Sequence, residues 1–290
     1  RPGPDRSGFW CTWTCLLSVN LSEADALSLP LFDGKFVAKI CEFHYNKVLL
    51  LMIFDTGGEG MTTLYLIRHA EAEGNLYRRI HGQYDSCVTP NGRRQIAALA
   101  QRFAGIPVDA VYASDLKRTC LTATAIYRQK GLPLHRDARF REVGLGPWED
   151  TPFGELERRY PAQLHAFSHD SYHWYVEGAE CFLQYAHRFL AGLDDVVRRH
   201  EGQSIAIFSH GMVLRGALIE LFFPGQDEGV SHSENTAVTE LHWENGSYEL
   251  ISLNDATHLT PELSTLGRQN WWRGSRYLDF NMWYRDVAPE

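Results

Sequence analysis

Short apolar runs alternate with longer helical stretches along most of the chain. Thr63–Arg68 and Ser204–Phe208 have the length and β-prone composition of buried strands. Pro90 directly after Thr89 is typical of a helix N-terminus, and Asn245-Gly246 between two β-prone runs predicts a hairpin. The predicted strands are 63–68, 110–113, 132–135, 204–208, 237–243 and 248–253; the predicted helices are 89–103, 114 or 115–130, 154–168, 179–200 and 212–222.

Strands that alternate with helices predict an α/β protein: a three-layer α/β/α sandwich with a mostly parallel sheet. Between two of the predicted helices, residues 139–153 are irregular and rich in glycine and proline.

Composition narrows the class. The 290 residues are 44% hydrophobic and 22% charged, which indicates a globular chain rather than a disordered one. A net charge of −8 gives no broad basic surface for nucleic acid. The longest apolar run, Val48–Phe54, is far shorter than the roughly 20 residues that span a bilayer. We therefore expect neither a nucleic-acid nor a membrane partner.

Residues 1–60 differ from the rest of the chain. They hold three of the five lysines, whereas arginine supplies nearly all positive charge after Met61. Gly57–Gly60 is typical of a flexible linker; alternatively, Met61 is the true start and residues 1–60 are translated upstream sequence. We expect residues 1–60 to lie outside the folded domain.

The cysteines and the first residues of the chain indicate in which cellular compartment the protein is expected. Cys11 and Cys15 lack a second pair for a zinc site, and the other cysteines are scattered, which favours reduced thiols. Residues 8–19 could pass for a signal-peptide core, but no typical cleavage site follows and Glu23 comes soon after. A cytoplasmic location is expected.

Basic and imidazole side chains follow three of the predicted strands. Arg68 and His69 end the first strand, and His210 and Gly211 follow the strand at 204–208. Arg118 lies one turn into the helix after another strand. Carboxyl ends of parallel strands share one edge, where ligands bind, so these side chains are expected to lie together. Guanidinium groups, imidazoles and helix N-termini at one edge predict a phosphate site.

Two imidazoles in such a site can do more than bind. A neutral imidazole is a competent nucleophile toward phosphorus near neutral pH, and water then hydrolyses the phosphohistidine. Arginine neutralises charge on the transferring oxygens. The leaving oxygen needs a proton, and Glu142 in the irregular stretch is the predicted acid.

Five ordered blocks resemble the histidine phosphatase superfamily, branch 1, also called the phosphoglycerate-mutase-like family. They are LYLIRHAEAEGN (64–75), HGQYDSCVTPNGRRQ (81–95), VYASDLKRTCLTATAI (111–126), FREVGLGPWED (140–150) and IFSHGMVLRGAL (207–218). With Asn235–Val238 they extend over about residues 61–258. The resemblance implies the fold of that family over this range and phosphomonoester hydrolysis without metal or organic cofactor. It is strongest toward broad-specificity and alpha-ribazole-type phosphatases.

The resemblance also implies residue roles. His69 is expected to be the phosphorylated nucleophile, Glu142 the proton donor and later the base, and His210 the third catalytic residue. The residues expected to bind the substrate and its phosphoryl group are Arg68, Asn75, His81, Gly82, Arg118, His210 and Gly211.

Three positions depart from the family pattern. Ala70 stands where glycine is usual, and small residues are tolerated there. His81 stands where glutamine is frequent, so it either tunes substrate choice or is an exposed histidine. Cys181 follows Glu180 where a Glu-Ser pair is common, and we expect a packed thiol.

Other functions compete with the phosphatase. A phosphoglycerate mutase shares the core, but the longer basic segment after the acid is absent, which favours a phosphatase. A non-catalytic binding relative is disfavoured because His69, Arg118, Glu142 and His210 are all present.

A metal-dependent hydrolase is a third alternative. His165, His169 and His173 are spaced like ligands on one helical face. A solvated face, or a helix that ends before His173, is the favoured interpretation.

The C-terminal residues 259–290 lie outside the blocks and mix Trp and Tyr with Arg. We expect this extension to pack on the domain and help shape the substrate entrance. The identity of the small phosphomonoester and the oligomeric state, with a homodimer as one possibility, stay open.

Overall fold

The computed structural model describes residues 36–43, 47–54, 60–226 and 229–269. The chain divides into two units, residues 1–58 and 59–290. In the first unit, strands β1 (Phe36–Phe43) and β2 (Lys47–Phe54) pair antiparallel. Sequence analysis predicted no element there. That residues 1–60 are an extension outside the domain stays a prediction.

The second unit is built on a six-stranded sheet. Its strands are β3 (Thr62–Arg68), β4 (Ala110–Ala113), β5 (Leu134–Arg136), β6 (Ser204–Ser209), β7 (Val238–Glu244) and β8 (Ser247–Asp255), in the order β5-β4-β6-β3-β7-β8. The pairs β5–β4, β4–β6 and β6–β3 are parallel. The pairs β3–β7 and β7–β8 are antiparallel. The sheet is mixed: its parallel part extends from the β5 edge to β3, and the antiparallel strands β7 and β8 form the other side.

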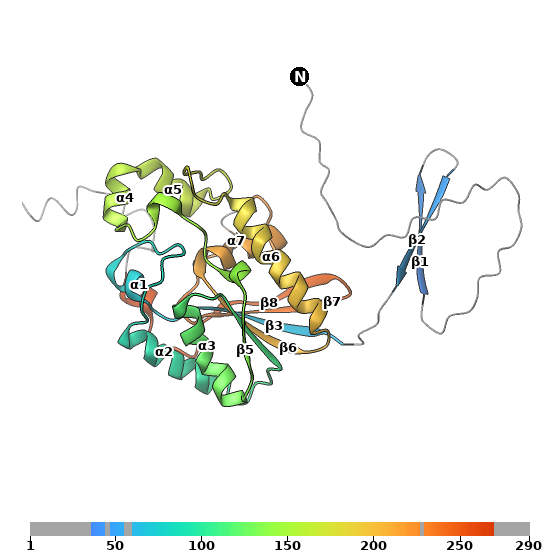
Figure 1. Ribbon diagram of the computed structural model, residues 1–290, viewed down its shortest axis with the longest axis horizontal. Helices are drawn as coiled ribbons and strands as arrows, with labels where there is room; N and C mark the ends of the chain where they lie inside the picture. The colour runs from blue at the N-terminus through green and yellow to red at the C-terminus, as the bar shows by residue number, and fades with distance from the viewer. Residues whose placement is uncertain (1–35, 44–46, 55–59, 227–228, 270–290) are drawn as a thin grey trace, which may run out of the picture. The chain divides into compact units, whose positions relative to one another are not determined.

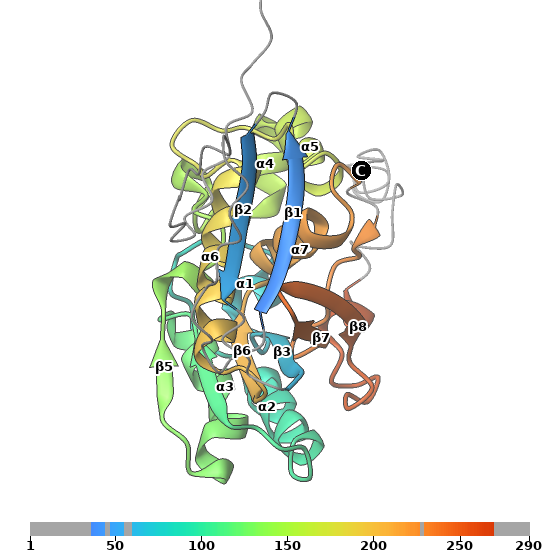
Figure 2. The same ribbon diagram turned by 90° about the vertical axis from the view of Figure 1, so that its right-hand side faces the viewer.

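Helices cover both faces of this sheet (Figures 1 and 2). They are α1 (Glu73–Tyr77), α2 (Pro90–Arg102), α3 (Lys117–Lys130), α4 (Phe153–Arg159), α5 (Pro161–His169), α6 (Phe182–Arg199), α7 (Gly211–Phe222) and α8 (Thr265–Arg268). Alternate residues of a strand point to opposite faces. Leu64 and Leu66 accordingly pack in the core that includes α6 and α7, whereas Ile67 packs with α2 and α3. The α/β three-layer fold predicted from the sequence is confirmed.

Local sequence explains where the elements differ from expectation. The helix predicted over 154–168 is two helices, because Pro161 has no N–H to donate and begins a new helix after Tyr160. The helix expected from 114 or 115 begins at Lys117, with Leu116 as its N-cap. Asp115 instead forms an ion pair with Arg141.

Other elements differ from the predicted bounds by a few residues. The helix expected from 179 begins at Phe182, and the strand expected over 132–135 is Leu134–Arg136. The irregular stretch 139–153 contains two short 3₁₀ turns, Ala138–Phe140 and Gly146–Trp148. The short helices α1 and α8 were not predicted, because four or five residues carry too little periodicity to detect.

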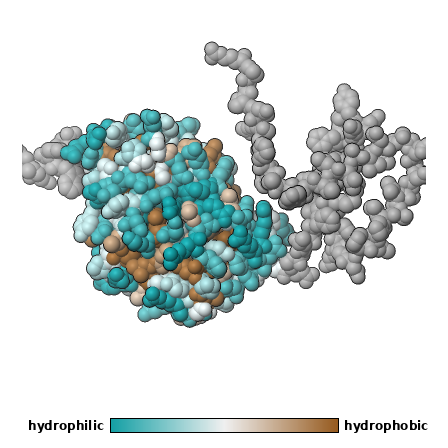
Figure 3. Space-filling model, viewed as in Figure 1, coloured by the Kyte–Doolittle hydropathy of each residue, from teal (hydrophilic) through white to brown (hydrophobic). Residues whose placement is uncertain are grey.

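The surface seen in Figure 3 is mostly hydrophilic, with apolar side chains in patches between polar ones. Among the residues that the structure describes, no helix combines the length and apolar character needed to cross a bilayer.

Candidate active site

The predicted site residues meet at the carboxyl edge of the parallel strands. His69 follows β3, His210 follows β6, and their ring centroids lie 5.2 Å apart. His81 joins them, with its centroid 6.1 Å from that of His69. Ser114 follows β4, and its hydroxyl lies 2.7 Å from His210 Nε2. His69 and His210 are 141 positions apart in the chain, and the pairing of β3 with β6 brings them together.

His69 is oriented by its own backbone. Its Nδ1 lies 2.8 Å from the carbonyl oxygen of Ala70, which can only accept, so Nδ1 carries the proton and Nε2 keeps its lone pair. The side chain is buried. Burial, followed by the charges of Arg118 and Arg68, holds the pKa of His69 well below its usual value. The imidazole is therefore neutral near pH 7.

His210 and Arg118 lie behind this imidazole. Arg118 Nε donates to His210 Nδ1 over 3.2 Å, and its two terminal nitrogens donate to the carbonyls of Gly82 and Tyr84. Both side chains are fully buried, and burial lowers the pKa of Arg118 to about 10. Neither residue is among those that line the cavity. The sequence predicted that both residues lie at the site, but it did not indicate that Arg118 holds the loop that contains Gly82 and Tyr84.

Arg68 presents an unused donor to the cavity. Its Nη1 donates to the Ser233 carbonyl over 2.5 Å, while its buried Nε has no partner among the described residues. A Cβ at Gly211 would lie only 3.2 Å from this Nε, so glycine leaves room in front of it. A buried cationic N–H without an acceptor is costly. This arrangement fits an anionic ligand between Arg68 and the N-terminus of α7.

Glu142 faces the same helix N-terminus. Its Oε1 accepts from Val213 N over 2.8 Å and from Val143 N over 3.1 Å, and its Oε2 accepts from Met212 N over 3.2 Å. The Glu142 carbonyl accepts from Gln83 and Arg188. The carboxyl group is thus fixed at the cavity wall.

Arg188 holds the loop that carries this acid. Its guanidinium donates to the carbonyls of Arg139 and Arg141 and forms an ion pair with Glu180 at 2.7 Å. Glu180 Oε2 also accepts from Gly144 N. The sequence does not predict this role for Glu180, which supports the loop through Arg188 and Gly144.

His81 is buried, so the interpretation as an exposed histidine is wrong. Its Nε2 lies 3.0 Å from the Ser86 hydroxyl. A Cβ at Gly74 would come within 1.9 Å of the same nitrogen, so the ring packs directly on Gly74. Gly82 adopts a left-handed conformation (φ 53°), which aims its carbonyl at Arg118.

Asn75 and Asn235 meet beside the nucleophile. Asn75 Oδ1 accepts from Ala72 N over 3.0 Å, so its amide N–H₂ group is left for a ligand. Asn235 Nδ2 donates to the His69 carbonyl over 2.8 Å. The rule that carboxyl ends of parallel strands meet could not predict Asn235 as a site residue. Strand β7 runs antiparallel and brings its amino end to this edge. The neighbouring Ser233 lines the cavity with a buried hydroxyl that has no partner among the described residues.

The cavity has an empty volume of about 910 Å³, open to solvent. Its polar lining includes Arg68, His69, Asn75, His81 and Glu142. Its apolar lining consists of Ile80, Val143, Leu145, Phe153, Phe167, Met212 and Leu266. Polar and apolar side chains therefore line the same cavity.

The three histidines weighed as a metal site do not form one. Helix α5 ends at His169, and His173 lies beyond it beside Asp170. Stacked rings bring His165 and His169 together, 4.5 Å between centroids. Within residues 60–226 and 229–269, no group of His, Cys, Asp and Glu is arranged to hold a metal ion.

His81→Gln is expected to flatten the pH dependence of stability. Burial, then the charges of Arg118 and Arg68, lower the pKa of His81 to about 3, whereas an unfolded histidine titrates near 6.5. Below that pH the unfolded chain binds a proton that the folded chain does not. The free energy of unfolding should therefore fall by about 1.4 kcal/mol per pH unit from this residue alone, between roughly pH 6.5 and 3.

Urea unfolding of the wild type and His81→Gln at several values between pH 7 and 4.5 measures this contribution. The variant should lose stability less steeply as the pH falls. Equal slopes for the two proteins would contradict the burial of a neutral His81.

Comparisons with known proteins agree with this geometry. The profile of the histidine phosphatase superfamily (branch 1) matches residues 64–256. Phosphoserine phosphatase 1 of Hydrogenobacter thermophilus is 28% identical over 200 residues, which cover 69% of this chain and 95% of that protein. The protein named "Probable phosphoglycerate mutase GpmB" of Serratia proteamaculans is 32% identical over 219 residues, which cover 72% and 100%.

A solved structure shares the fold. Bacillus stearothermophilus YhfR matches with a TM-score of 0.65 at 29% identity, covering 68% of this chain and 98% of that one. The profile match spans all five sequence blocks and most of the sheet. The chain belongs to the histidine phosphatase superfamily, branch 1.

Proposed function

We propose that this chain hydrolyses small phosphomonoesters through a phosphohistidine formed at His69 Nε2. Its family and the phosphatase among its relatives make it a phosphoric monoester hydrolase that acts on a small phosphorylated molecule. The observation that carries the proposed mechanism is the buried, neutral His69, whose Nδ1 proton is tied to the Ala70 carbonyl. That contact aims a lone pair, rather than a proton, at the substrate.

The first step transfers the phosphoryl group to the enzyme. Arg68 Nε, the Asn75 amide and the Gly211 N–H at the start of α7 bind the phosphoryl oxygens, and Arg118 adds positive charge from behind neutral His210. His69 Nε2 attacks phosphorus, and the bond from phosphorus to the ester oxygen breaks. Glu142 donates a proton to the departing oxygen, and the alcohol leaves.

Glu142 Oε2 is the oxygen suited to carry that proton. It accepts a single backbone bond of 3.2 Å, whereas Oε1 already accepts two. In the second step the Glu142 carboxylate takes a proton from water, and the water oxygen attacks phosphorus. The bond from phosphorus to Nε2 breaks, which releases inorganic phosphate and restores neutral His69.

His81 and Gly82 shape the wall of the pocket in this proposal. His81 is neutral and packed between Gly74 and Ser86, so it offers a hydrogen bond near the ester oxygen without adding charge. Gly82 acts through Arg118, to which its carbonyl is bonded. The cytoplasmic location and the homodimer stay predictions.

A phosphoglycerate mutase is the second candidate, because several relatives carry that name. Phosphate release from a panel of phosphomonoesters, ranked by kcat/KM, tests the phosphatase directly. A coupled assay on 3-phosphoglycerate measures mutase activity in parallel. We expect release of inorganic phosphate to dominate; faster interconversion of phosphoglycerates than phosphate release would favour the mutase, and neither activity would favour a binding protein.

A further inference from the structure

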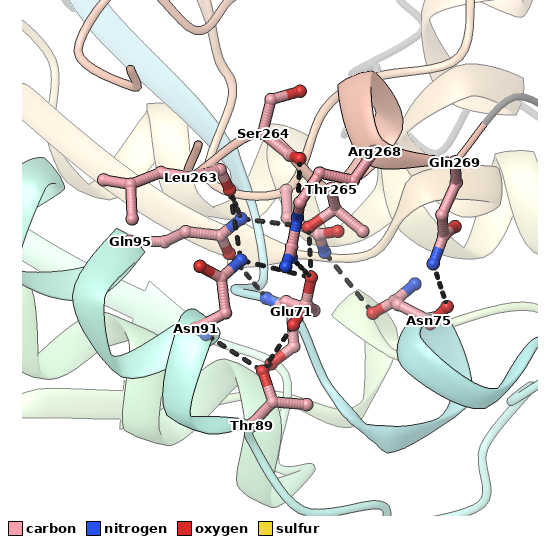
Figure 4. Close-up of polar contacts among 12 residues, drawn as sticks. Glu71, Asn75, Thr89, Asn91, Gln95, Leu263, Ser264, Thr265, Arg268 and Gln269 are labelled. Atoms are coloured by element: carbon pink, nitrogen blue, oxygen red, sulfur yellow. Dashed lines mark hydrogen bonds and ion pairs between the residues drawn. The ribbon is translucent and has the colours of Figure 1, made fainter. Parts of the chain in front are cut away.

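The segment Leu263–Gln269, which contains α8, lies against the loop that follows the nucleophile (Figure 4). Leu266 in this segment is buried and lines the active-site cavity. Gln269 Nε2 donates to the Asn75 carbonyl over 2.6 Å. None of the five sequence blocks includes this segment, so its contribution to the cavity comes from the structure alone.

Glu71 is the first point of attachment. It lies two residues after His69, and only 1% of its side chain is exposed. From the 263–269 segment its Oε2 accepts from Thr265 Oγ1 over 2.8 Å and from Arg268 Nη2 over 2.5 Å. From α2 and its N-cap it accepts from Thr89 Oγ1 over 2.6 Å and from Asn91 Nδ2 over 3.2 Å. Figure 4 shows these donors converging on the carboxylate.

Glu234 is the second point of attachment. Its Oε2 accepts from Leu266 N over 2.9 Å and from Ser264 Oγ over 2.5 Å, and its Oε1 accepts from Thr265 N over 3.2 Å. Glu234 directly precedes Asn235, whose amide holds the His69 carbonyl. The two carboxylates therefore connect the segment to both backbone loops that carry the nucleophile and its neighbours.

Detaching the segment would cost free energy. It would take the donors Thr265 and Arg268 from Glu71, and this buried carboxylate would keep only Thr89 and Asn91 as side-chain donors. Backbone and side-chain donors on Glu234 would be lost at the same time.

We propose that Leu263–Gln269 is a fixed wall of the active site, in which Leu266 contacts an apolar leaving group of the substrate and Glu71 and Glu234 hold that residue in place. The inference rests on the proposed phosphatase function and adds the chemical class of the leaving group. Leu266 adds to the apolar lining of the cavity, which also includes Phe153, Phe167 and Met212.

Two esters with similar leaving-group chemistry test the contact. Benzyl phosphate and ethyl phosphate both release a primary alcohol, but only the first carries a ring that can reach an apolar wall. Leu266→Ala should lower kcat/KM for benzyl phosphate about tenfold more than for ethyl phosphate, mainly through KM. The variant-to-wild-type ratio cancels the intrinsic reactivity of each ester.

Leu99→Ala is the matched control. Leu99 belongs to α2, is fully buried in the core that contains Ile67, and does not line the cavity. It should lower the melting temperature while changing kcat/KM for the two esters by the same factor. Equal losses for both esters in Leu266→Ala would overturn the proposed contact.

The attachment is tested by the double variant Thr265→Val, Arg268→Met, which removes two donors from Glu71. The preference for benzyl over ethyl phosphate should fall toward that of Leu266→Ala, and Arg268→Lys alone should keep most of it. Arg128→Met, which removes an exposed arginine from α3, is the control. An unchanged preference in the double variant would overturn the role of Glu71.

Failure of this inference is distinguishable from failure of the proposed function. If the wild type releases phosphate from esters but Leu266→Ala does not change the preference for benzyl over ethyl phosphate, the proposed contact of Leu266 is wrong and the phosphatase function is retained. If the wild type releases phosphate from no ester in the panel, the phosphatase itself is wrong.

Discussion

Replacing His69 by alanine is expected to abolish phosphate release, with kcat lowered by about 10⁴-fold or more. Alanine removes the nitrogen that would bond to phosphorus. Ser233 has a hydroxyl there, but no base among the described residues contacts it. The fold should tolerate the change, because the backbone N–H of residue 69 still donates to the Ser209 carbonyl.

The measurement is a single-turnover assay with a ³²P-labelled ester, followed by rapid quench at alkaline pH, where phosphohistidine survives. The wild type should carry label and His69→Ala should not. His165→Ala, which removes an exposed imidazole from α5, is the control and should keep wild-type activity. Label retained on His69→Ala would contradict His69 as the nucleophile.

Replacing Glu142 by glutamine should give the second-largest loss, about 10²- to 10³-fold in kcat/KM for alkyl phosphates. Glutamine keeps the shape of the side chain and one acceptor oxygen for Val213 N, but it cannot donate a proton to the leaving oxygen. The loss should shrink to about tenfold or less for p-nitrophenyl phosphate, because that leaving group departs without a proton.

This dependence on the leaving group separates catalysis from structure. A purely structural role would lower kcat/KM equally for alkyl and aryl esters, since both need the same fold. The experiment is therefore a comparison of kcat/KM, which reports phosphoryl transfer and not the later hydrolysis, for ethyl phosphate and p-nitrophenyl phosphate in wild type and Glu142→Gln. Parallel losses for the two esters would assign the proton transfer to another group.

One physical rule allowed the sequence to predict which strand-end side chains lie together. Parallel strands put their carboxyl ends at one edge, so His69 and His210 could be brought together without coordinates. The same rule could not reach Asn235, since its strand is antiparallel and contributes its amino end. It could not show that Arg118 donates to the carbonyls of Gly82 and Tyr84, because backbone carbonyls are present at every residue.

The apolar residues that line the cavity were harder to predict than the side chains at the strand ends. Ile80 and Leu145 line the cavity from irregular segments, and Phe167 lines it from α5. Leu266 depends on a four-residue helix far along the chain, which leaves no periodic signal. The part of the C-terminal extension beyond residue 269 lies outside the described residues, so its expected packing stays a prediction.

The contacts at Glu71 also set the order in which the enzyme can become complete during synthesis. Thr265 and Arg268 are 194 and 197 residues later in the chain than the carboxylate that they hold. Contacts this far apart form late in folding, because a long loop must close before they contribute. The nucleophile loop is translated early, yet its surroundings are finished only after residue 268 has left the ribosome. A nascent chain shorter than this can fold much of its sheet and still lack a closed catalytic pocket.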